Sequence, residues 1–183
     1  MLVLDQLPAL TDIEGFTDWD VRGLELRQAS LIEELPPMRA RPEPAPGDLD
    51  ARYMFRLVVD GNVRLRSMVG LPPLGYIWDG LVIRDNDMLI ELAGLEHLQQ
   101  VSADGPAYAV LIEGNMVLRN LDALDPSIEG SFAGHGNGQM SAIRDNQNLP
   151  TCLIEDFLRE VYMMPVDEVS SWVVEGNSEE PCS

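Results

Sequence analysis

The chain has 183 residues, with 31 acidic side chains against 12 basic ones and a formal net charge of -19. Such a negative field repels phosphate groups, which argues against a protein that binds nucleic acid or an anionic membrane. A hydrophobic fraction of 45% is too high for a disordered chain and favours a single folded domain over residues 1–183. The longest uncharged, largely apolar stretch, residues 67–78, is broken by glycine and proline, so no membrane insertion is predicted.

One apolar phrase recurs along the chain. From Leu81, apolar residues, an Asn and a Gly follow at fixed offsets, and the copy that begins at Leu57 repeats this spacing. The first two copies lack the Asn, and the last copy is truncated. The copies begin at residues 2, 24, 57, 81, 110, 141 and 172, at separations of 22 to 33 residues. That period is typical of a solenoid, and it predicts a mainly β fold of about six to seven coils.

The start of each copy predicts a short strand. Most copies open with two apolar residues at alternate positions, as a strand with one buried face requires, and stacked copies would form a parallel sheet. The third residue after each start should therefore project outward, and its charge alternates in sign along the chain, which favours stacking in this register. This charge ladder consists of Asp5, Arg27, Asp60, Arg84, Glu113, Arg144 and Glu175.

The residue directly after each start is also expected to face outward. This column is apolar in six of seven copies and reads Val3, Glu25, Val58, Val82, Leu111, Ala142 and Val173. An exposed apolar stripe marks a contact surface, whereas the strand preference of Val explains the same column equally well. The predicted binding face comprises Val58, Val82, Arg84, Leu111 and Glu113.

An Asn follows the strand in five copies, where the chain turns out of the sheet. A buried amide there satisfies backbone groups of the turn and of the next coil, so a structural ladder is predicted. The residue before each Asn is Gly or Asp, which tolerates a tight or left-handed turn. The predicted ladder comprises Asn62, Asn86, Asn115, Asn146 and Asn177.

Two cysteines, Cys152 and Cys182, lie near the C-terminus. On their spacing alone, a bridge that closes about thirty residues and two unrelated buried thiols are equally favoured.

The phrases LVIRDNDMLIELAGLEHLQQV and VLIEGNMVLRNLDAL, together with the ending IRDNQNLPTCLIEDFL, resemble the receptor L-domain family of leucine-rich solenoid modules. The resemblance covers nearly the whole chain and is weaker in the first two copies and over residues 39–55. A typical leucine-rich repeat places Leu two residues after the Asn, whereas here the Leu is the third residue after the Asn. The resemblance implies a right-handed parallel β-solenoid without catalytic machinery, exported and used for recognition, as in the insulin and epidermal growth factor receptor ectodomains and in bacterial surface proteins. It also implies that Cys152 pairs with Cys182.

Three segments depart from the repeat. Residues 153–163 are predicted to form a helix that caps the last coil, with Thr151 available as its N-cap. Residues 39–50 are rich in proline and are predicted to form an inserted loop, and residues 130–138 a Gly-rich one.

The sequence offers little catalytic chemistry, so no enzyme, cofactor or metal site is predicted. His97 and His135 are the only histidines and lie in different copies, which argues against a shared metal site. The outward acids alternate with arginines, so no carboxylate pair is free for acid and base catalysis. Four aromatic residues could stack on sugars or fill core gaps, and these are Trp19, Tyr76, Trp78 and Tyr108.

Three functions follow, in order. The first is a recognition module, extracellular, periplasmic or on the cell surface, that binds a protein or glycan; we expect its export signal to be missing from this sequence. The second is a structural envelope or adhesion domain that self-associates through the solenoid ends, since no element precedes the strand at Leu2 to cap the N-terminal edge. The third is a carbohydrate-active enzyme.

Overall fold

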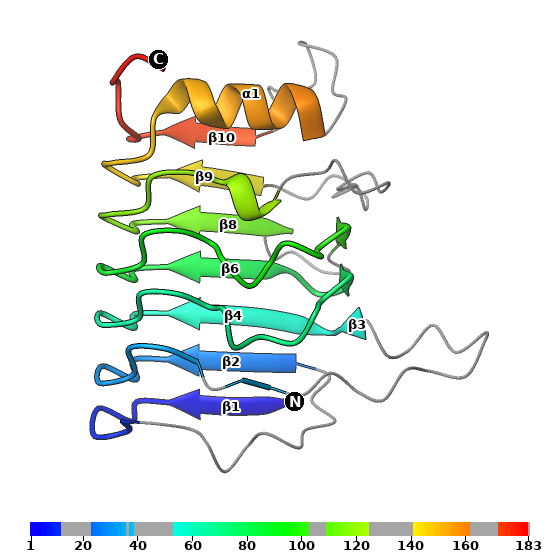
Figure 1. Cartoon of the computed structure of the whole chain (residues 1–183), viewed down its shortest axis with the longest axis vertical. Coiled ribbons are helices and arrows are strands. Elements are labelled where there is room, and N and C mark those ends of the chain that lie inside the picture. Colours follow the sequence, from blue (N-terminus) through cyan, green and yellow to red (C-terminus); the bar gives the residue numbers. More distant parts are fainter. Residues whose placement is uncertain are drawn as a thin grey trace, which may run out of the picture.

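The computed structural model describes residues 1–11, 23–35, 37–38, 53–102, 109–124, 141–161 and 172–182. In these ranges the chain is mainly β, with two parallel sheets and one α-helix (Figure 1). The loops predicted at 39–50 and 130–138 lie outside the described residues.

The long sheet contains seven parallel strands, arranged in chain order. They are β1 (Leu2–Asp5), β2 (Gly23–Arg27), β4 (Arg56–Asp60), β6 (Leu81–Arg84), β8 (Val110–Glu113), β9 (Ser141–Arg144) and β10 (Trp172–Glu175). The short sheet is also parallel and contains β3 (Tyr53–Met54), β5 (Tyr76–Ile77) and β7 (Gln100–Val101). A single turn of 3-10 helix, η3 (Asp122–Leu124), and the helix α1 (Thr151–Val161) complete the described elements.

The pairing register of the long sheet confirms the predicted alignment of the copies. Leu24 lies opposite Leu2 on one side and Leu57 on the other, and the same correspondence of starts continues through Leu81 to Val110. A slip of one residue would turn each strand's apolar set to the opposite face, so the inward apolar pattern specifies this register.

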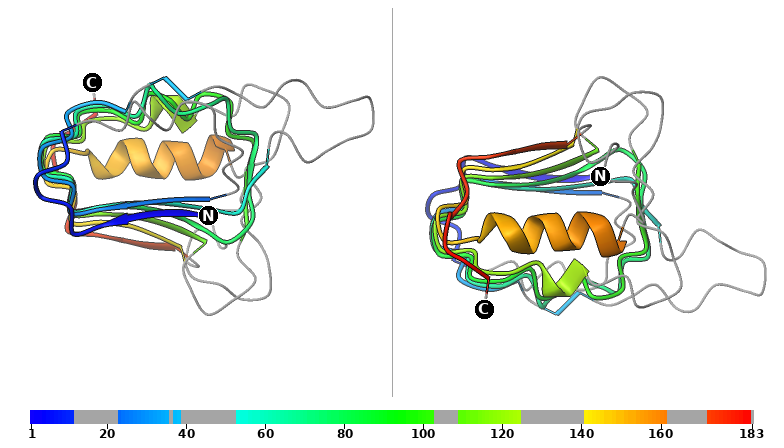
Figure 2. Two further views of the ribbon diagram at one scale, coloured as in Figure 1. Left: turned by 90° about the horizontal axis from the view of Figure 1, so that it is seen from below. Right: turned by 90° about the horizontal axis from the view of Figure 1, so that it is seen from above.

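The core lies inside the outline that the stacked strands and their connections form (Figure 2). Apolar residues at the repeat offsets fill it, and in the copy that begins at Leu81 all seven of these residues are buried. They are Leu81, Ile83, Leu89, Leu92, Leu95, Leu98 and Val101.

A residue with left-handed backbone conformation follows each strand of the long sheet. The backbone φ is positive at the fourth residue after every start, as predicted for the Gly and Asp positions. The first two copies place Gln6 and Gln28 there, with φ of 53° and 52°, a conformation that costs energy for these residue types. The chain therefore turns in the same way in every copy, with or without a favourable residue.

The helix α1 begins two residues earlier than predicted. Thr151, expected as its N-cap, is the first helical residue, and the carbonyl of Pro150 accepts the first helical hydrogen bond, from the backbone N–H of Ile154 at 3.4 Å. The Thr151 hydroxyl instead donates to the carbonyl of Ser178, at 3.0 Å, after β10. Position 163, the predicted end, lies outside the described residues.

The helix covers the end of the core beside β10 (Figures 1 and 2). Its side chains Ile154, Phe157 and Leu158 are buried in the same core as the strands. No helix in the described part of the chain is long and apolar enough to cross a membrane.

Candidate functional site

The asparagine ladder is formed as predicted. The side-chain amide of Asn115 donates to the carbonyls of Ile83, at 3.0 Å, and Glu113, at 3.2 Å, and its Oδ1 accepts the backbone N–H of Asn86, at 3.2 Å. The same three bonds recur at Asn62, Asn86, Asn146 and Asn177. Four of the five asparagines are fully buried, so these amides hold the turns together and are closed to a ligand.

The ladder ends in the copy that begins at Leu24. Its Asn position holds Ala29, which is fully buried and donates its backbone N–H to Oδ1 of Asn62, at 3.1 Å. The second copy lacks the amide but stays bonded to both neighbours, because the Arg27 carbonyl accepts the N–H of Gln6 in the first copy, at 3.1 Å.

The charge ladder pairs in the predicted register. Arg84 binds both carboxylate oxygens of Asp60, at 2.9 Å each, and Arg27 binds the same carboxylate at 3.1 Å. Arg144 binds Glu113 at 2.8 Å. Arg27 lies opposite Asp5 in register, but the described residues include no cation within ion-pair distance of the Asp5 carboxylate. The interior acids are thus neutralised by their neighbours.

The pKa is raised at two adjacent residues, Arg84 and Asp85, which favours the charged form of the arginine and the neutral form of the aspartate. The hydrogen bond to Asp60 raises the pKa of Arg84, which keeps the guanidinium charged. Partial desolvation raises the pKa of Asp85, an exposed residue directly after the strand, and the nearby Arg84 charge only partly opposes this.

The predicted exposed apolar stripe is wrong at three of its six apolar positions. Val58 and Ala142 are fully buried and Leu111 is 6% exposed, while Val82 is half-buried. Val58 is flanked in register by Glu25 and Val82, and Leu111 by Val82 and Ala142, so neighbouring side chains of the same column cover these positions. Val3, at the edge strand β1, remains 45% exposed.

Ion pairs flank this outer column. Glu25, its one charged member, lies 3.6 Å from Nε of Arg56 and 3.2 Å from Nε of Arg27. Arg84 and Glu113, the charged members of the predicted binding face, belong to the ladder. Of the predicted binding face, Val58 and Leu111 are therefore buried, whereas Val82, Arg84 and Glu113 are partly exposed.

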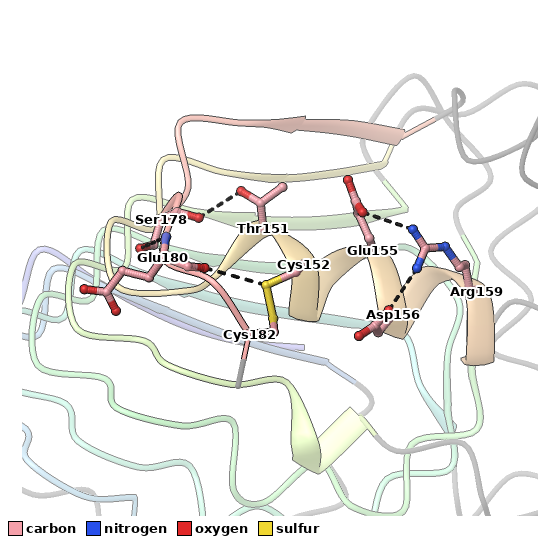
Figure 3. The surroundings of a disulfide bond; sticks show 8 residues. All are labelled: Thr151, Cys152, Glu155, Asp156, Arg159, Ser178, Glu180 and Cys182. Carbon is pink, nitrogen blue, oxygen red and sulfur yellow. Dashed lines mark hydrogen bonds and ion pairs between the residues drawn. A yellow bond between two sulfur atoms is a disulfide. The ribbon is translucent and has the colours of Figure 1, made fainter.

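The two cysteines form a disulfide, with the Cα atoms of Cys152 and Cys182 6.1 Å apart (Figure 3). Cys152 lies in the first turn of α1, and Cys182 follows β10, so the bond ties the last strand's tail to the helix. On the solvent side of the same helix, Arg159 pairs with Glu155 and Asp156.

No group of three His, Cys, Asp or Glu side chains in the described ranges is arranged to hold a metal ion. His97 is exposed, and His135 lies outside the described residues.

Exposed aromatic side chains gather at the short sheet instead. Phe55 follows β3 and is 61% exposed, and Trp78 follows β5 and is 44% exposed. Tyr76, two residues before Trp78, is half-buried, and the intervening Ile77 is buried in the core. We call Phe55 and Trp78 the aromatic pair.

Polar groups surround the aromatic pair. Asp79 lies next to Trp78 and holds Nη1 of Arg56 at 3.7 Å, and the Ser102 hydroxyl donates to the Trp78 carbonyl at 3.3 Å. Nε of Arg56 is buried and has no hydrogen-bond acceptor among the described residues, since its 3.6 Å approach to Glu25 is an ion-pair contact only.

Tyr76 and Trp78 could be predicted as candidates from the sequence, whereas Phe55 could not. Strands of two residues are too short for an alternating pattern, and the repeat offsets pass over positions 55 and 78. Trp19 and Tyr108 lie outside the described residues.

Comparisons with protein-family models, curated proteins and solved structures found no match for this chain.

Proposed function

We propose that the chain is a non-catalytic recognition module, a right-handed parallel solenoid of the receptor L-domain type that spans residues 1–183. The common register of seven strands, the five-membered asparagine ladder and the terminal helix support this architecture. The Cys152–Cys182 disulfide supports an exported protein, because disulfides persist in oxidising compartments.

The observation that carries a binding function is the exposure of the aromatic pair. Large aromatic side chains bury much apolar surface when they meet a partner, and Trp and Tyr dominate many interfaces. Most polar side chains of the two ladders are already bonded within the fold. The short sheet, and not the outer face of the long sheet, is therefore the proposed binding surface.

The test is a binding screen with the intact, disulfide-bonded chain. The immobilised protein is exposed to arrays of purified glycans and of extracellular protein domains, and each bound glycan is then analysed for cleavage. We expect binding without turnover. Turnover of a bound glycan would favour the carbohydrate-active enzyme, and failure to bind on both arrays would contradict a recognition module.

Self-association is the second candidate, and the N-terminal edge favours it. The strand β1 is an edge strand of the long sheet, and Met1, Val3 and Leu7 beside it are exposed. Edge strands of this kind pair readily with other strands.

A further inference from the structure

We infer that the aromatic pair, with Tyr76, binds the apolar face of an uncharged sugar chain. This inference rests on the proposed recognition function and names its ligand class. Sugar rings present C–H groups on their faces and hydroxyl groups around their edges, so they suit aromatic rings bordered by polar groups.

Backbone hydrogen bonds place the two segments that carry the pair next to each other. Trp78 N–H donates to the Met54 carbonyl at 3.1 Å, and Asp79 N–H donates to the Phe55 carbonyl at 2.6 Å. Chain segments paired in this way lie about 4.8 Å apart. Met54 and Ile77, which end the two strands, are buried, whereas the next residue along each segment is exposed, Phe55 by 61% and Trp78 by 44%.

Hydrogen-bonding groups lie within the same rows. Gln100 is the register partner of Tyr76, and Ser102 follows β7 as Trp78 follows β5. Arg56 and Asp79 add a guanidinium and a carboxylate beside the pair, and the contacts of Arg56 with its two acids are 3.6 and 3.7 Å, longer than hydrogen bonds. These groups supply both donors and acceptors for sugar hydroxyls.

Size and charge favour a sugar over a protein. A stable protein interface buries about 1,000 Å² or more around an apolar centre, whereas this surface has two or three rings and is bordered at once by Arg56 and Asp79. The net charge of -19 repels uronate or sulfated polymers, which leaves an uncharged chain.

The experiment is a calorimetric titration of the intact chain with hexasaccharides of β-1,4-linked glucose, α-1,4-linked glucose, β-1,4-linked mannose and β-1,4-linked N-acetylglucosamine. We expect at least one to bind, and Trp78→Ala to weaken that affinity about tenfold or more through lost ring stacking. Phe55→Ala should weaken it as well, and Trp78→Phe should keep most of it. The matched control is Val69→Ala, which truncates another exposed apolar side chain.

Salt separates stacking from charge attraction. Because the ligand is uncharged, its affinity should change little between 0.05 and about 0.5 M salt, where charge attraction is strongly screened. An oligogalacturonate should not bind.

The remaining outcomes overturn the inference. These are no binding by any of the four hexasaccharides, equal losses in Val69→Ala and Trp78→Ala, or binding that both aromatic variants retain. If a purified protein domain binds through Trp78 while every sugar fails, the glycan inference falls and the proposed recognition function stands. Melting temperatures check that both variants remain folded, and Trp78→Phe, which keeps a ring at this position, provides the comparison at near-constant volume.

Discussion

The buried asparagines each bond two neighbouring chain segments. Removal of the Asn115 side chain leaves the carbonyls of Ile83 and Glu113 and the N–H of Asn86 without that partner in a dry environment. We expect Asn115→Ala to lower the free energy of unfolding by about 3 kcal/mol, because each buried unsatisfied group costs about 1–3 kcal/mol. Urea unfolding measures this.

The control is Asn148→Ala, which also removes a side-chain hydrogen bond, to the Met116 carbonyl at 2.7 Å, but from an exposed position. It should change stability by less than about 1 kcal/mol. If both variants lowered the free energy of unfolding equally, burial of the ladder would not explain the effect of Asn115→Ala.

Asp85 makes a pH-dependent contribution to stability, and this contribution is unfavourable when its carboxylate is charged. Asp85 is exposed, but partial desolvation raises its pKa in the folded chain, so its charged form slightly destabilises the fold above that pKa, and this stability is regained as the pH falls through it. Asn tolerates the left-handed backbone at this position, where φ is 54°. We therefore expect Asp85→Asn to melt at a higher temperature than the wild type at pH 7.

This difference should shrink as the pH falls through the Asp range, because the wild-type carboxyl becomes neutral as well. Thermal melts of both proteins between pH 3 and 7 check it. A constant difference over the whole range would show that charge at Asp85 is not its cause.

At the scale of the elements, the charge ladder links neighbouring strands. Arg84→Glu would remove both 2.9 Å bonds to Asp60 and place a third carboxylate between Asp60 and Glu113. We expect a loss of about 2 kcal/mol at low salt that decreases at high salt, as read from melting curves.

Arg64→Glu is the matched control for charge reversal. Arg64 lies 3.8 Å from Glu33, and both side chains are more than half exposed, so the pair contributes little. If the two reversals lower the melting temperature equally, net charge and not strand register explains the effect.

The disulfide acts on the last strand and the helix together. It closes a loop with a sequence separation of 30 residues, for which chain entropy gives about 3–4 kcal/mol of stabilisation. We expect reductant to lower the melting temperature of the wild type and to raise amide exchange first in α1 and β10. The double variant Cys152→Ser/Cys182→Ser should melt at the same low temperature with or without reductant. If complete reduction left the melting temperature of the wild type unchanged, the disulfide would not stabilise the fold.

At the scale of the whole molecule, the strands of the long sheet could be predicted because each inward side chain must meet the same core. A Leu or Asn at the wrong offset would leave a gap or an unbonded amide, which makes the spacing informative. Burial of Val58 and Leu111 and exposure of Phe55 could not be predicted in this way. Those environments depend on what lies against the outer faces, and no repeat offset describes that.

The helix α1 and the net negative charge both oppose end-to-end association of two molecules. The helix α1 covers the core at one end, and head-to-tail contact of two long sheets would place Glu175 of one copy beside Asp5 of the next. Like charges on neighbouring strands repel, as do two chains of charge -19.

We therefore expect a monomer in sedimentation velocity at low salt over a hundredfold range of protein concentration. Screening at high salt weakens the repulsion but leaves α1 in place, so any association there should be weak and should involve the exposed edge at β1. Val3→Lys adds a charge on that edge and should abolish it, whereas Val69→Lys should not. A stable oligomer at low salt would reverse the order of the two proposed functions, because self-association through the ends would then outweigh recognition by the short sheet.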